Sequence, residues 1–374
     1  MEFVPVNKPS LNGNELKYLA ECIESGWISS EGPFVEEFEK KFAERIGRKA
    51  GIAVSNGSAA LELAVAALGI GPGDEVILPA FTIISCALAI TRAGAIPVLV
   101  DCDPNTWNMS VDEIEGKITD KTKAVMAVHI FGLPVDLDPL LALCNKHGIM
   151  LIEDSAESIG LSYRNKPCGS FGEISAFSFY ANKHVTMGEG GLVAVNNENL
   201  EAKCRSLRNL CFKEPRFVHE NLGWNMRLTN LQAAVGLAQL ERLDWLISRK
   251  RHMGERYNRH LADVPGLQLP VQKTEYAENC YWVYGIVLGD AVDLDAQEMM
   301  KILRKKKIDS RPFFWPLHQQ PVFNREGVFL DEHYPVSENI ARRGLYLPSG
   351  ATITDEQIEY VAETVKSILK KKTG

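Results

Sequence analysis

Between residues 50 and 200, short apolar runs alternate with stretches of helical periodicity, and this alternation limits the folds open to the chain. Within the runs, apolar and polar residues do not alternate, which is typical of strands buried on both faces of a sheet. Strands separated by helices favour an α/β fold with a mostly parallel sheet flanked by helices. The expected strands are residues 51–54, 75–79, 96–101, 124–129, 150–154, 175–179 and 191–195.

Several of these runs end in a polar or charged residue. Asp101, His129 and Asp154 each stand at the end of an expected strand. In open α/β sheets, ligands bind in the crevice outside the carboxyl ends of the strands. The sequence therefore predicts a ligand site at this edge of the sheet.

The C-terminal third of the chain predicts a second domain. Helical spacing continues from residue 229 to 259, which we interpret as one long connecting helix. A strand-like run at 281–288 and helical patterns near 294–306 and 354–371 suit a compact α+β domain. A chain of 374 residues also exceeds the usual size of a single core. We expect a large domain, residues 1–245 with 1–30 as an N-terminal arm, and a small C-terminal domain, residues 246–374.

Composition and charge narrow the class of protein. A net charge of −7, with no dense basic stretch except three lysines at 370–372, argues against nucleic acid as a partner. No apolar stretch reaches the roughly 18 residues of a membrane span, and no signal-peptide pattern opens the chain, so we expect a cytoplasmic protein that is not inserted in a membrane. The eight cysteines are scattered, which predicts reduced thiols and no metal site.

Residues 178–191 (SFYANKHVTMGEGG), here called the lysine loop, place Lys183 among aromatic, hydroxyl and glycine residues. A lysine held in this way can form a Schiff base. Pyridoxal phosphate (PLP) needs such a lysine for its aldehyde and a carboxylate, here Asp154, to keep its ring nitrogen protonated. An isolated lysine after a buried strand is usually just an exposed surface residue. That interpretation explains neither the glycine cluster nor the position of Asp154, so the PLP interpretation is favoured.

Residues 55–58 (SNGS) lie between an expected strand and a helical pattern that begins at Leu61. Backbone N–H groups at a helix N-terminus, together with the Ser58 hydroxyl, form a ready anion site. The same residues also suit an ordinary turn and helix cap. Combined with the lysine loop, they predict the phosphate site of the cofactor.

These motifs together resemble the nucleotide-sugar aminotransferases of the DegT/DnrJ/StrS family, which have the aspartate-aminotransferase-like fold of PLP enzymes. The likeness covers nearly the whole chain. The chain is similar in particular to the perosamine-forming branch of the family, whose members aminate GDP-4-keto-6-deoxymannose at C4 and use glutamate as the amino donor. Besides the lysine loop and residues 55–58, the resemblance rests on residues 25–30 (SGWISS), 71–76 (GPGDEV), 128–132 (VHIFG), 153–157 (EDSAE), 224–230 (WNMRLTN) and 311–318 (RPFFWPLH).

The resemblance implies roles for residues around the cofactor ring. Lys183 would hold the cofactor and carry the proton between substrate and cofactor carbons, and Asp154 would pair with the ring nitrogen. Glu157 stands where many members carry glutamine or histidine near the ring hydroxyl. Ile83 stands where members usually have an aromatic residue stacked on the ring. Isoleucine gives up that stacking, worth roughly 0.5–1.5 kcal/mol, unless Phe81 takes it over.

The resemblance further implies a shared site in a homodimer or a dimer of dimers. Gly57, Ser58 and Ser178 would hold the cofactor phosphate, and Asn225 would reach the phosphate bound by a neighbouring subunit. The other partners would be the nucleotide sugar and glutamate.

Three positions resemble those near the sugar nucleotide in the family. Trp27 and Ser29 belong to the expected N-terminal arm, and His318 ends the motif at 311–318. For His318, a histidine satisfied within its own loop is the alternative interpretation.

Other functions stay open at this stage. The same chemistry could act on a UDP- or dTDP-linked 4-keto or 3-keto sugar. A related branch replaces the lysine by histidine and becomes a sugar dehydratase, and here His184 follows Lys183; because Lys183 is retained in register with the glycines, transamination is favoured. A non-catalytic regulator on the same fold is a third possibility, against which the retention of Lys183, Asp154 and Ser178 argues.

Overall fold

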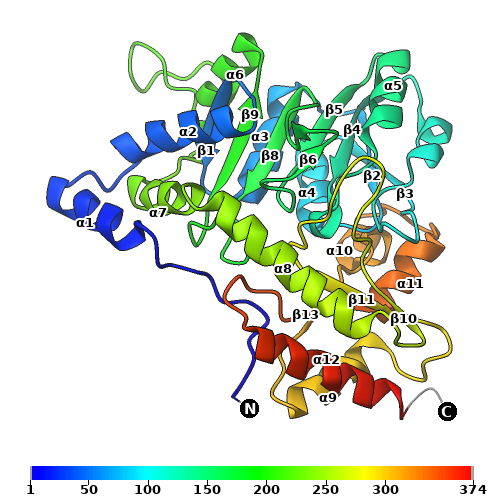
Figure 1. Ribbon diagram of the computed structural model, residues 1–374. Helices are drawn as coiled ribbons and strands as arrows, with labels where there is room; N and C mark the ends of the chain where they lie inside the picture. The colour runs from blue at the N-terminus through cyan, green and yellow to red at the C-terminus, as the bar shows by residue number, and fades with distance from the viewer. Residues whose placement is uncertain (1, 372–374) are drawn as a thin grey trace.

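A seven-stranded sheet forms the centre of the computed structural model, which describes residues 2–371 (Figure 1). β9 runs antiparallel to both of its neighbours, and every other neighbouring pair is parallel. The predicted mostly parallel sheet is therefore confirmed. In spatial order its strands are β1 (Ala50–Val54), β9 (Gly191–Val195), β8 (Ile174–Ser178), β5 (Met150–Asp154), β4 (Thr122–Val128), β2 (Glu75–Pro79) and β3 (Ile96–Val100).

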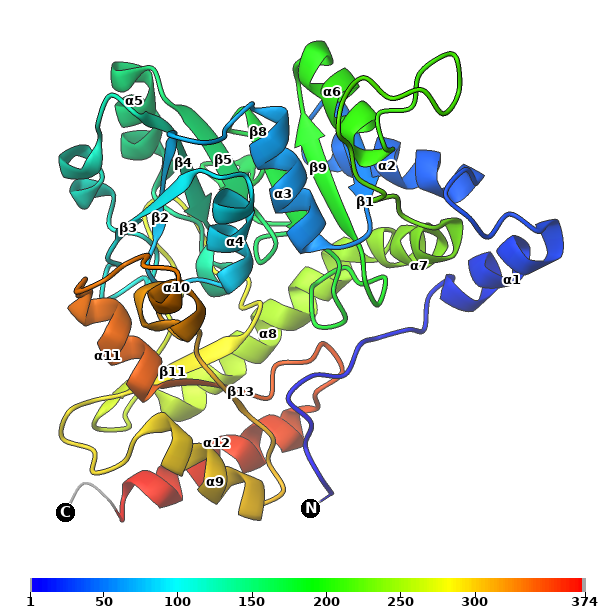
Figure 2. The same cartoon turned by 180° about the vertical axis from the view of Figure 1, so that it is seen from behind.

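Helices cover both faces of this sheet and continue into the C-terminal part of the chain (Figures 1 and 2). The α-helices are α1 (Glu15–Ser25), α2 (Pro33–Arg45), α3 (Gly57–Ala67), α4 (Ile84–Arg92), α5 (Leu137–His147), α6 (Glu198–Arg208), α7 (Asn230–Leu240), α8 (Leu243–Leu261), α9 (Ala296–Lys305), α10 (Pro321–Arg325), α11 (Pro335–Arg343) and α12 (Asp355–Leu369). Short 3-10 turns are η1 (Val111–Glu113), η2 (Glu115–Lys117), η3 (Ile130–Gly132) and η4 (Leu317–Gln319).

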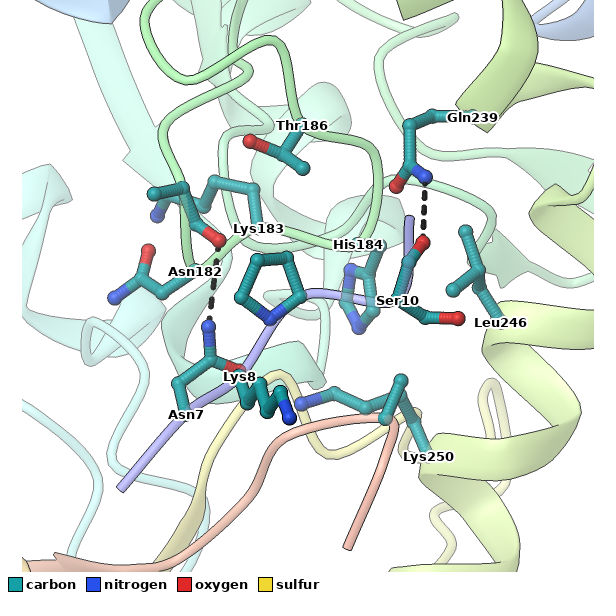
Figure 3. A pocket seen from close by; sticks show the side chains of 13 residues that line it. Asn7, Lys8, Ser10, Asn182, Lys183, His184, Thr186, Gln239, Leu246 and Lys250 are labelled. Carbon is teal, nitrogen blue, oxygen red and sulfur yellow. Dashed lines mark hydrogen bonds between the residues drawn. The ribbon is translucent and has the colours of Figure 1, made fainter. Parts of the chain in front are cut away.

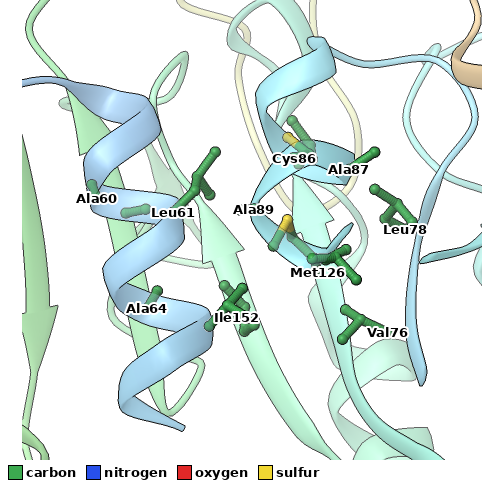
Figure 4. Close-up of a cluster of buried hydrophobic side chains, with 14 of the residues drawn as sticks. Ala60, Leu61, Ala64, Val76, Leu78, Cys86, Ala87, Ala89, Met126 and Ile152 are labelled. Carbon is green, nitrogen blue, oxygen red and sulfur yellow. The ribbon is translucent and has the colours of Figure 1, made fainter. Parts of the chain in front are cut away.

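The two faces of the large sheet carry separate cores. Val76 and Leu78 of β2 belong to the cluster with α3 and α4 that Figure 4 shows. Ile77, between them, belongs instead to the cluster with α2, α5 and α7. Successive side chains of a strand point to opposite faces, so a strand covered on both sides is apolar throughout. This explains the runs without polar alternation.

A second sheet of four antiparallel strands, here called the C-terminal sheet, lies beyond α8. Its order is β10 (Leu267–Gln268), β11 (Tyr284–Leu288), β13 (Gly344–Leu347) and β12 (Arg311–Pro312), and it shares a core with α8, α9 and α12. The predicted helices near 294–306 and 354–371 are α9 and α12. The expected domain boundary after residue 245 falls within α8 and stays a prediction. A further two-stranded sheet pairs β6 (Ser162–Tyr163) with β7 (Lys166–Pro167).

The prediction of one helix over residues 229–259 is wrong, because α7 ends at Leu240 and α8 begins at Leu243. No glycine or proline marks the break. At the bend, the Glu241 carboxylate accepts hydrogen bonds from Asn14 Nδ2 and Tyr18 Oη, each 2.7 Å long. Contacts with a segment more than 200 residues away therefore hold the bend, and the helical periodicity of residues 229–259 carries no sign of them.

The N-terminal segment, residues 2–13, runs from the C-terminal sheet to the lysine loop before α1 begins (Figure 2). Val4 N–H donates to the Lys307 carbonyl at 2.9 Å, and Asn7 Nδ2 donates to the Ala181 carbonyl at 3.3 Å. α1 then packs against α7. The segment therefore connects the two sheets independently of α8.

Three further features concern the described residues 2–371. All eight cysteines are free and buried. Within this range no helix is both long enough and apolar enough to cross a membrane, and no three histidine, cysteine or acidic side chains gather as a metal site would require.

Candidate active site

A pocket of about 570 Å³ opens at the carboxyl ends of the parallel strands. Its walls come from the ends of β4, β5 and β8, from the lysine loop and from aromatic side chains next to the C-terminal sheet. This is the edge at which polar strand ends predicted a site. Seven of the predicted site residues line it, namely Gly57, Ser58, Ile83, Asp154, Glu157, Ser178 and Lys183.

Asp154, the last residue of β5, presents a buried carboxylate to the pocket. Its Oδ2 accepts a hydrogen bond from Cys86 Sγ at 3.2 Å, and its Oδ1 accepts one from Ala156 N–H at 3.1 Å. Burial, together with the neighbouring Asp154 charge, raises the pKa of Cys86 well above its usual value, so the thiol keeps its proton and donates. The carboxylate is thus fixed in orientation, as the partner of a protonated ring nitrogen must be.

Lys183 projects from the lysine loop into the same pocket, with its side chain 10% exposed. Its Nζ lies 3.5 Å from Glu157 Oε1 and 3.6 Å from the centre of the Trp282 ring. Desolvation lowers the pKa of Lys183, although the Glu157 and Asp154 charges oppose the shift. A lowered pKa increases the share of neutral amine, which is the nucleophilic form.

Glu157 is the proton partner of Lys183 in this geometry. Burial raises the pKa of Glu157 to about 7, against the opposing charge of Lys183 and the hydrogen bond from Phe131 N–H at 2.9 Å. The pKa of the carboxyl group moves up while that of the ammonium group moves down, which brings the two values closer and favours proton exchange between the two groups. The pair is therefore suited to general acid–base chemistry.

The turn before α3 gathers anion-binding groups. Asn56 Oδ1 caps the helix by accepting from Ala59 N–H at 2.9 Å, and the hydroxyls of Ser58 and Ser85 lie 2.8 Å apart. A Cβ added to Gly57 would come within 2.7 Å of Ser178 Cβ, so only glycine lets the turn approach β8 this closely. Hydroxyls beside a helix N-terminus fit a phosphate group. Together with Asp154 and Lys183, these donors fit PLP.

Four predicted residues do not line this pocket. Trp27, Ser29 and Asn225 are exposed, and Asn225 Oδ1 accepts from Arg227 Nε at 3.0 Å. His318 is buried, with its Nε2 2.9 Å from Glu338 Oε1. Its Nδ1 has no hydrogen-bond partner within residues 2–371, so a place near the sugar nucleotide stays a prediction for His318.

Sequence reasoning missed the aromatic wall opposite the large sheet. Trp282, Phe314 and Tyr346 line the pocket there, and Trp282 Nε1 donates to the Asn182 carbonyl at 3.0 Å. Phe314 lies within the motif at 311–318, whereas no pattern marks the other two. Phe81 is fully buried and does not line the pocket, so Ile83, 40% exposed, is the side chain at the expected stacking position.

A much smaller cavity of about 20 Å³ lies beside the lysine loop and shares Asn182 and Lys183 with the main pocket (Figure 3). Lys250 of α8 reaches it and donates to the carbonyl groups of Trp282, at 2.7 Å, and Ser349. Burial lowers the pKa of Lys250 to about 7. His184 faces the same cavity, and its Nε2 lies 3.4 Å from Cys280 Sγ.

Known proteins share both the sequence and the fold of this chain. The model of the DegT/DnrJ/EryC1/StrS aminotransferase family matches residues 9–366. A GDP-perosamine synthase from Vibrio cholerae is 42% identical over 97% of this chain and 98% of that protein. DesV of S. venezuelae, solved with a ketimine intermediate, is 31% identical with a TM-score of 0.91 and 98% of each chain covered. Spr1654 of Streptococcus pneumoniae, solved in a PLP form, is 27% identical with a TM-score of 0.92 and 99% of each chain covered.

Proposed function

Because the chain belongs to the DegT/DnrJ/EryC1/StrS aminotransferase family, a family of PLP-dependent enzymes, we propose that it aminates a nucleotide-linked 4-keto-6-deoxyhexose. The proposed acceptor is GDP-4-keto-6-deoxymannose, the product GDP-perosamine and the amino donor glutamate. The GDP-perosamine synthase from Vibrio cholerae, 42% identical, supports this choice. The single structural observation that carries the proposal is the meeting of Lys183, Glu157 and Asp154 in one pocket.

In this proposal Gly57, Ser58 and Ser178 hold the phosphate group of the cofactor, and Ile83 covers one face of its ring. Bound PLP supplies a ring that withdraws electrons from the carbon bearing the transferred amine, provided that its nitrogen stays protonated. Asp154 maintains that protonation, because its carboxylate is buried and fixed by two hydrogen bonds.

Lys183 and Glu157 carry the proton movements. Lys183 Nζ takes a proton from the carbon of the donor and returns it to the carbon that accepts the amine. Glu157 Oε1, 3.5 Å away, holds the proton that Lys183 must release or regain between these events. Trp282, Phe314 and Tyr346 limit the access of water to this pair from one side.

The experiment that tests this function measures turnover with defined acceptors. Purified protein with PLP and glutamate is incubated with GDP-, UDP- and dTDP-linked keto sugars, and each amino-sugar product is identified by mass spectrometry. We expect the GDP-linked 4-keto sugar to be aminated fastest. Faster turnover of a UDP- or dTDP-linked sugar would show that this sugar, and not the GDP-linked one, is the preferred acceptor. The proposed transamination chemistry would stand. A protein that takes up no PLP and shows no borohydride-sensitive visible absorbance would refute the function.

We also propose that the active site is completed by a second copy of the chain. The exposure of Trp27, Ser29 and Asn225 leaves these side chains available to a partner. Mixing the variants Lys183→Ala and Asn225→Ala tests this proposal, because in a mixed dimer one site inherits both changes and the other inherits neither. Recovery of activity on mixing is the expected result. An active monomer in sedimentation, or mixed dimers without activity, would contradict it.

A further inference from the structure

A side pocket of about 350 Å³ adjoins the active-site pocket. The two share four lining residues, Tyr180, Asn182, Trp282 and Tyr346. The N-terminal segment forms its outer wall with residues 6, 7 and 9. None of the roles assigned above uses this space. A reactant whose amine or carbonyl group lies at Lys183 can extend into it without crossing the sheet.

Arg311 is the only charged side chain among the described residues that line the side pocket. It belongs to β12 and stands directly opposite Tyr346 of β13. Directly opposed residues of an antiparallel pair project from the same face of a sheet. The guanidinium group and the phenol ring at the junction of the two pockets are therefore neighbours, and each lines the side pocket.

The guanidinium group of Arg311 is only partly used by the protein. Its Nη1 donates to Asp309 Oδ1 at 3.0 Å and to the Ser310 carbonyl at 3.1 Å. Within residues 2–371, neither its Nε nor its Nη2 has a hydrogen-bond partner. The side chain is 51% exposed. Arginine presents its donors as a planar fork that matches the two oxygens of a carboxylate or a phosphate.

The main pocket itself carries few positive charges, so the positive charge of Arg311 next to it matters for an anionic reactant. Asp154, Glu157 and Glu189 line that pocket, and among the described residues Lys183 is the only basic side chain there. Both reactants of the proposed reaction are anions, since glutamate carries two carboxylates and a sugar nucleotide carries a diphosphate. Away from the phosphate turn, the main pocket therefore offers them little electrostatic attraction. The neighbouring positive charge of Arg311 lies where it can compensate.

We propose that Arg311 and the side pocket form an anion subsite, which binds an anionic oxygen group of a reactant while its reacting carbon lies at Lys183. The proposal rests on the proposed function. The shared chemistry is that of a carboxylate of the amino donor or a phosphate of the nucleotide. Tyr346 and Asn182 supply further polar groups along the junction between the pockets.

The test compares Arg311→Gln with the parent enzyme by calorimetry, with glutarate as the dicarboxylate probe and GDP as the diphosphate probe. A matched control is Arg304→Gln. Arg304 also pairs with Asp309, at 3.1 Å, but does not line the side pocket. We expect Arg311→Gln to raise the Kd of one probe at least tenfold and to leave the other within twofold, whereas Arg304→Gln changes neither. The affected probe identifies the source of the anionic group.

Half-reactions followed by the absorbance of the holoenzyme give an independent measurement. If the subsite binds the donor, Arg311→Gln raises the glutamate concentration needed for half-maximal rate at least tenfold and leaves that for the keto sugar unchanged. If it binds the nucleotide, the effect falls on the keto sugar alone. Arg311→Lys should recover part of the loss.

Two outcomes separate this proposal from the proposed function. The subsite proposal alone is overturned if the parent enzyme turns over and Arg311→Gln stays within twofold of it in every measurement. These measurements are the Kd of each probe and the half-maximal concentration in each half-reaction. A parent that aminates no nucleotide sugar overturns the proposed function, and the subsite with it.

Discussion

Lys183 projects from the lysine loop and Lys250 of α8 reaches the same loop; both line the small cavity beside it, and burial lowers the pKa of both. Lys183 faces a pocket of about 570 Å³ and has the Glu157 carboxylate 3.5 Å away. Lys250 faces a cavity of about 20 Å³, and within residues 2–371 it donates only to backbone carbonyl groups. A lowered lysine pKa is thus no sufficient mark of a catalytic residue. Space for a reactant and a proton partner distinguish the two.

The two lysines are nevertheless connected through one residue. Lys250 Nζ donates to the Trp282 carbonyl, and the ring of Trp282 lies 3.6 Å from Lys183 Nζ. Lys250 therefore helps to fix the wall against which Lys183 rests. Its contribution is structural, so its removal should lower the free energy of unfolding more than it lowers the activity.

The largest expected effect separates the two lysines by activity. Lys183→Ala should abolish transamination, because it removes both the covalent attachment point and the proton carrier. Lys250→Met should keep activity within about tenfold of the parent, roughly 1.4 kcal/mol of barrier, because Lys250 touches no reactant. Steady-state assays with the preferred keto sugar measure both. Turnover by Lys183→Ala above background, or complete loss in a folded Lys250→Met, would break the comparison.

A smaller effect is expected for Asp154→Asn, in the pocket of about 570 Å³ that Lys183 lines. A neutral side chain no longer holds the ring nitrogen protonated, so the rate should fall by about a hundredfold, roughly 3 kcal/mol of barrier, while PLP stays bound. Glu189→Gln is the matched control, since it neutralises another carboxylate that lines the same pocket. A rate for Asp154→Asn within about threefold of the parent, or an equal loss in the control, would assign the ring nitrogen to another residue.

The free energy of unfolding should depend on pH because of Lys250. The pKa of Lys250 is about 7 in the folded protein and about 10.4 in an unfolded chain, so between these values the unfolded state binds the extra proton. This group therefore makes the folded protein more stable as the pH rises from 7 toward 10, by up to about 1.4 kcal/mol per pH unit. Denaturant titrations of the parent and of Lys250→Met at pH 7.5 and 9 measure the difference, which should reach roughly 2 kcal/mol. Equal pH dependence in the two proteins would show that Lys250 is charged throughout.

The smallest expected effect concerns the other wall of the Lys183 pocket. Ile83→Tyr restores an aromatic ring at a position that is 40% exposed and open to the pocket. Stacking should lower the Kd of PLP by up to about tenfold, corresponding to roughly 0.5–1.5 kcal/mol. Equilibrium dialysis of the holoenzyme measures it, with Ile83→Leu as the control that keeps an aliphatic side chain. Weaker binding by the tyrosine variant would mean that the pocket has no room for a ring there.

The sequence predicted the large sheet well, because its signals are local. Strands covered on both faces are apolar over most of their length, so β2 and β5 lie where the apolar runs are. Asp154 was found because it ends such a run. The bend after Leu240 was not predicted, since Glu241 is held there by Asn14, which precedes α1, and by Tyr18 of α1.

The far wall of the site shows the same limit. Trp282 and Tyr346 reach the pocket only because the C-terminal sheet packs beside the lysine loop. Their own neighbours in the sequence carry no pattern that predicts this position. His318 shows the reverse case, since its motif predicted a position near the substrate, while its ring does not line the pocket and its Nε2 pairs with Glu338.

The antiparallel course of β9 has a consequence for how the site assembles during folding. β8 and β9 pair with Ser178 opposite Gly191, so the lysine loop is the connection of a hairpin and the shortest link between neighbouring strands of the large sheet. Closing a short connection costs less chain entropy than closing a long one. Lys183 and Ser178, which line the same pocket, are therefore brought together by local pairing, whereas Glu157 and the turn at Gly57 must be recruited from more distant parts of the chain.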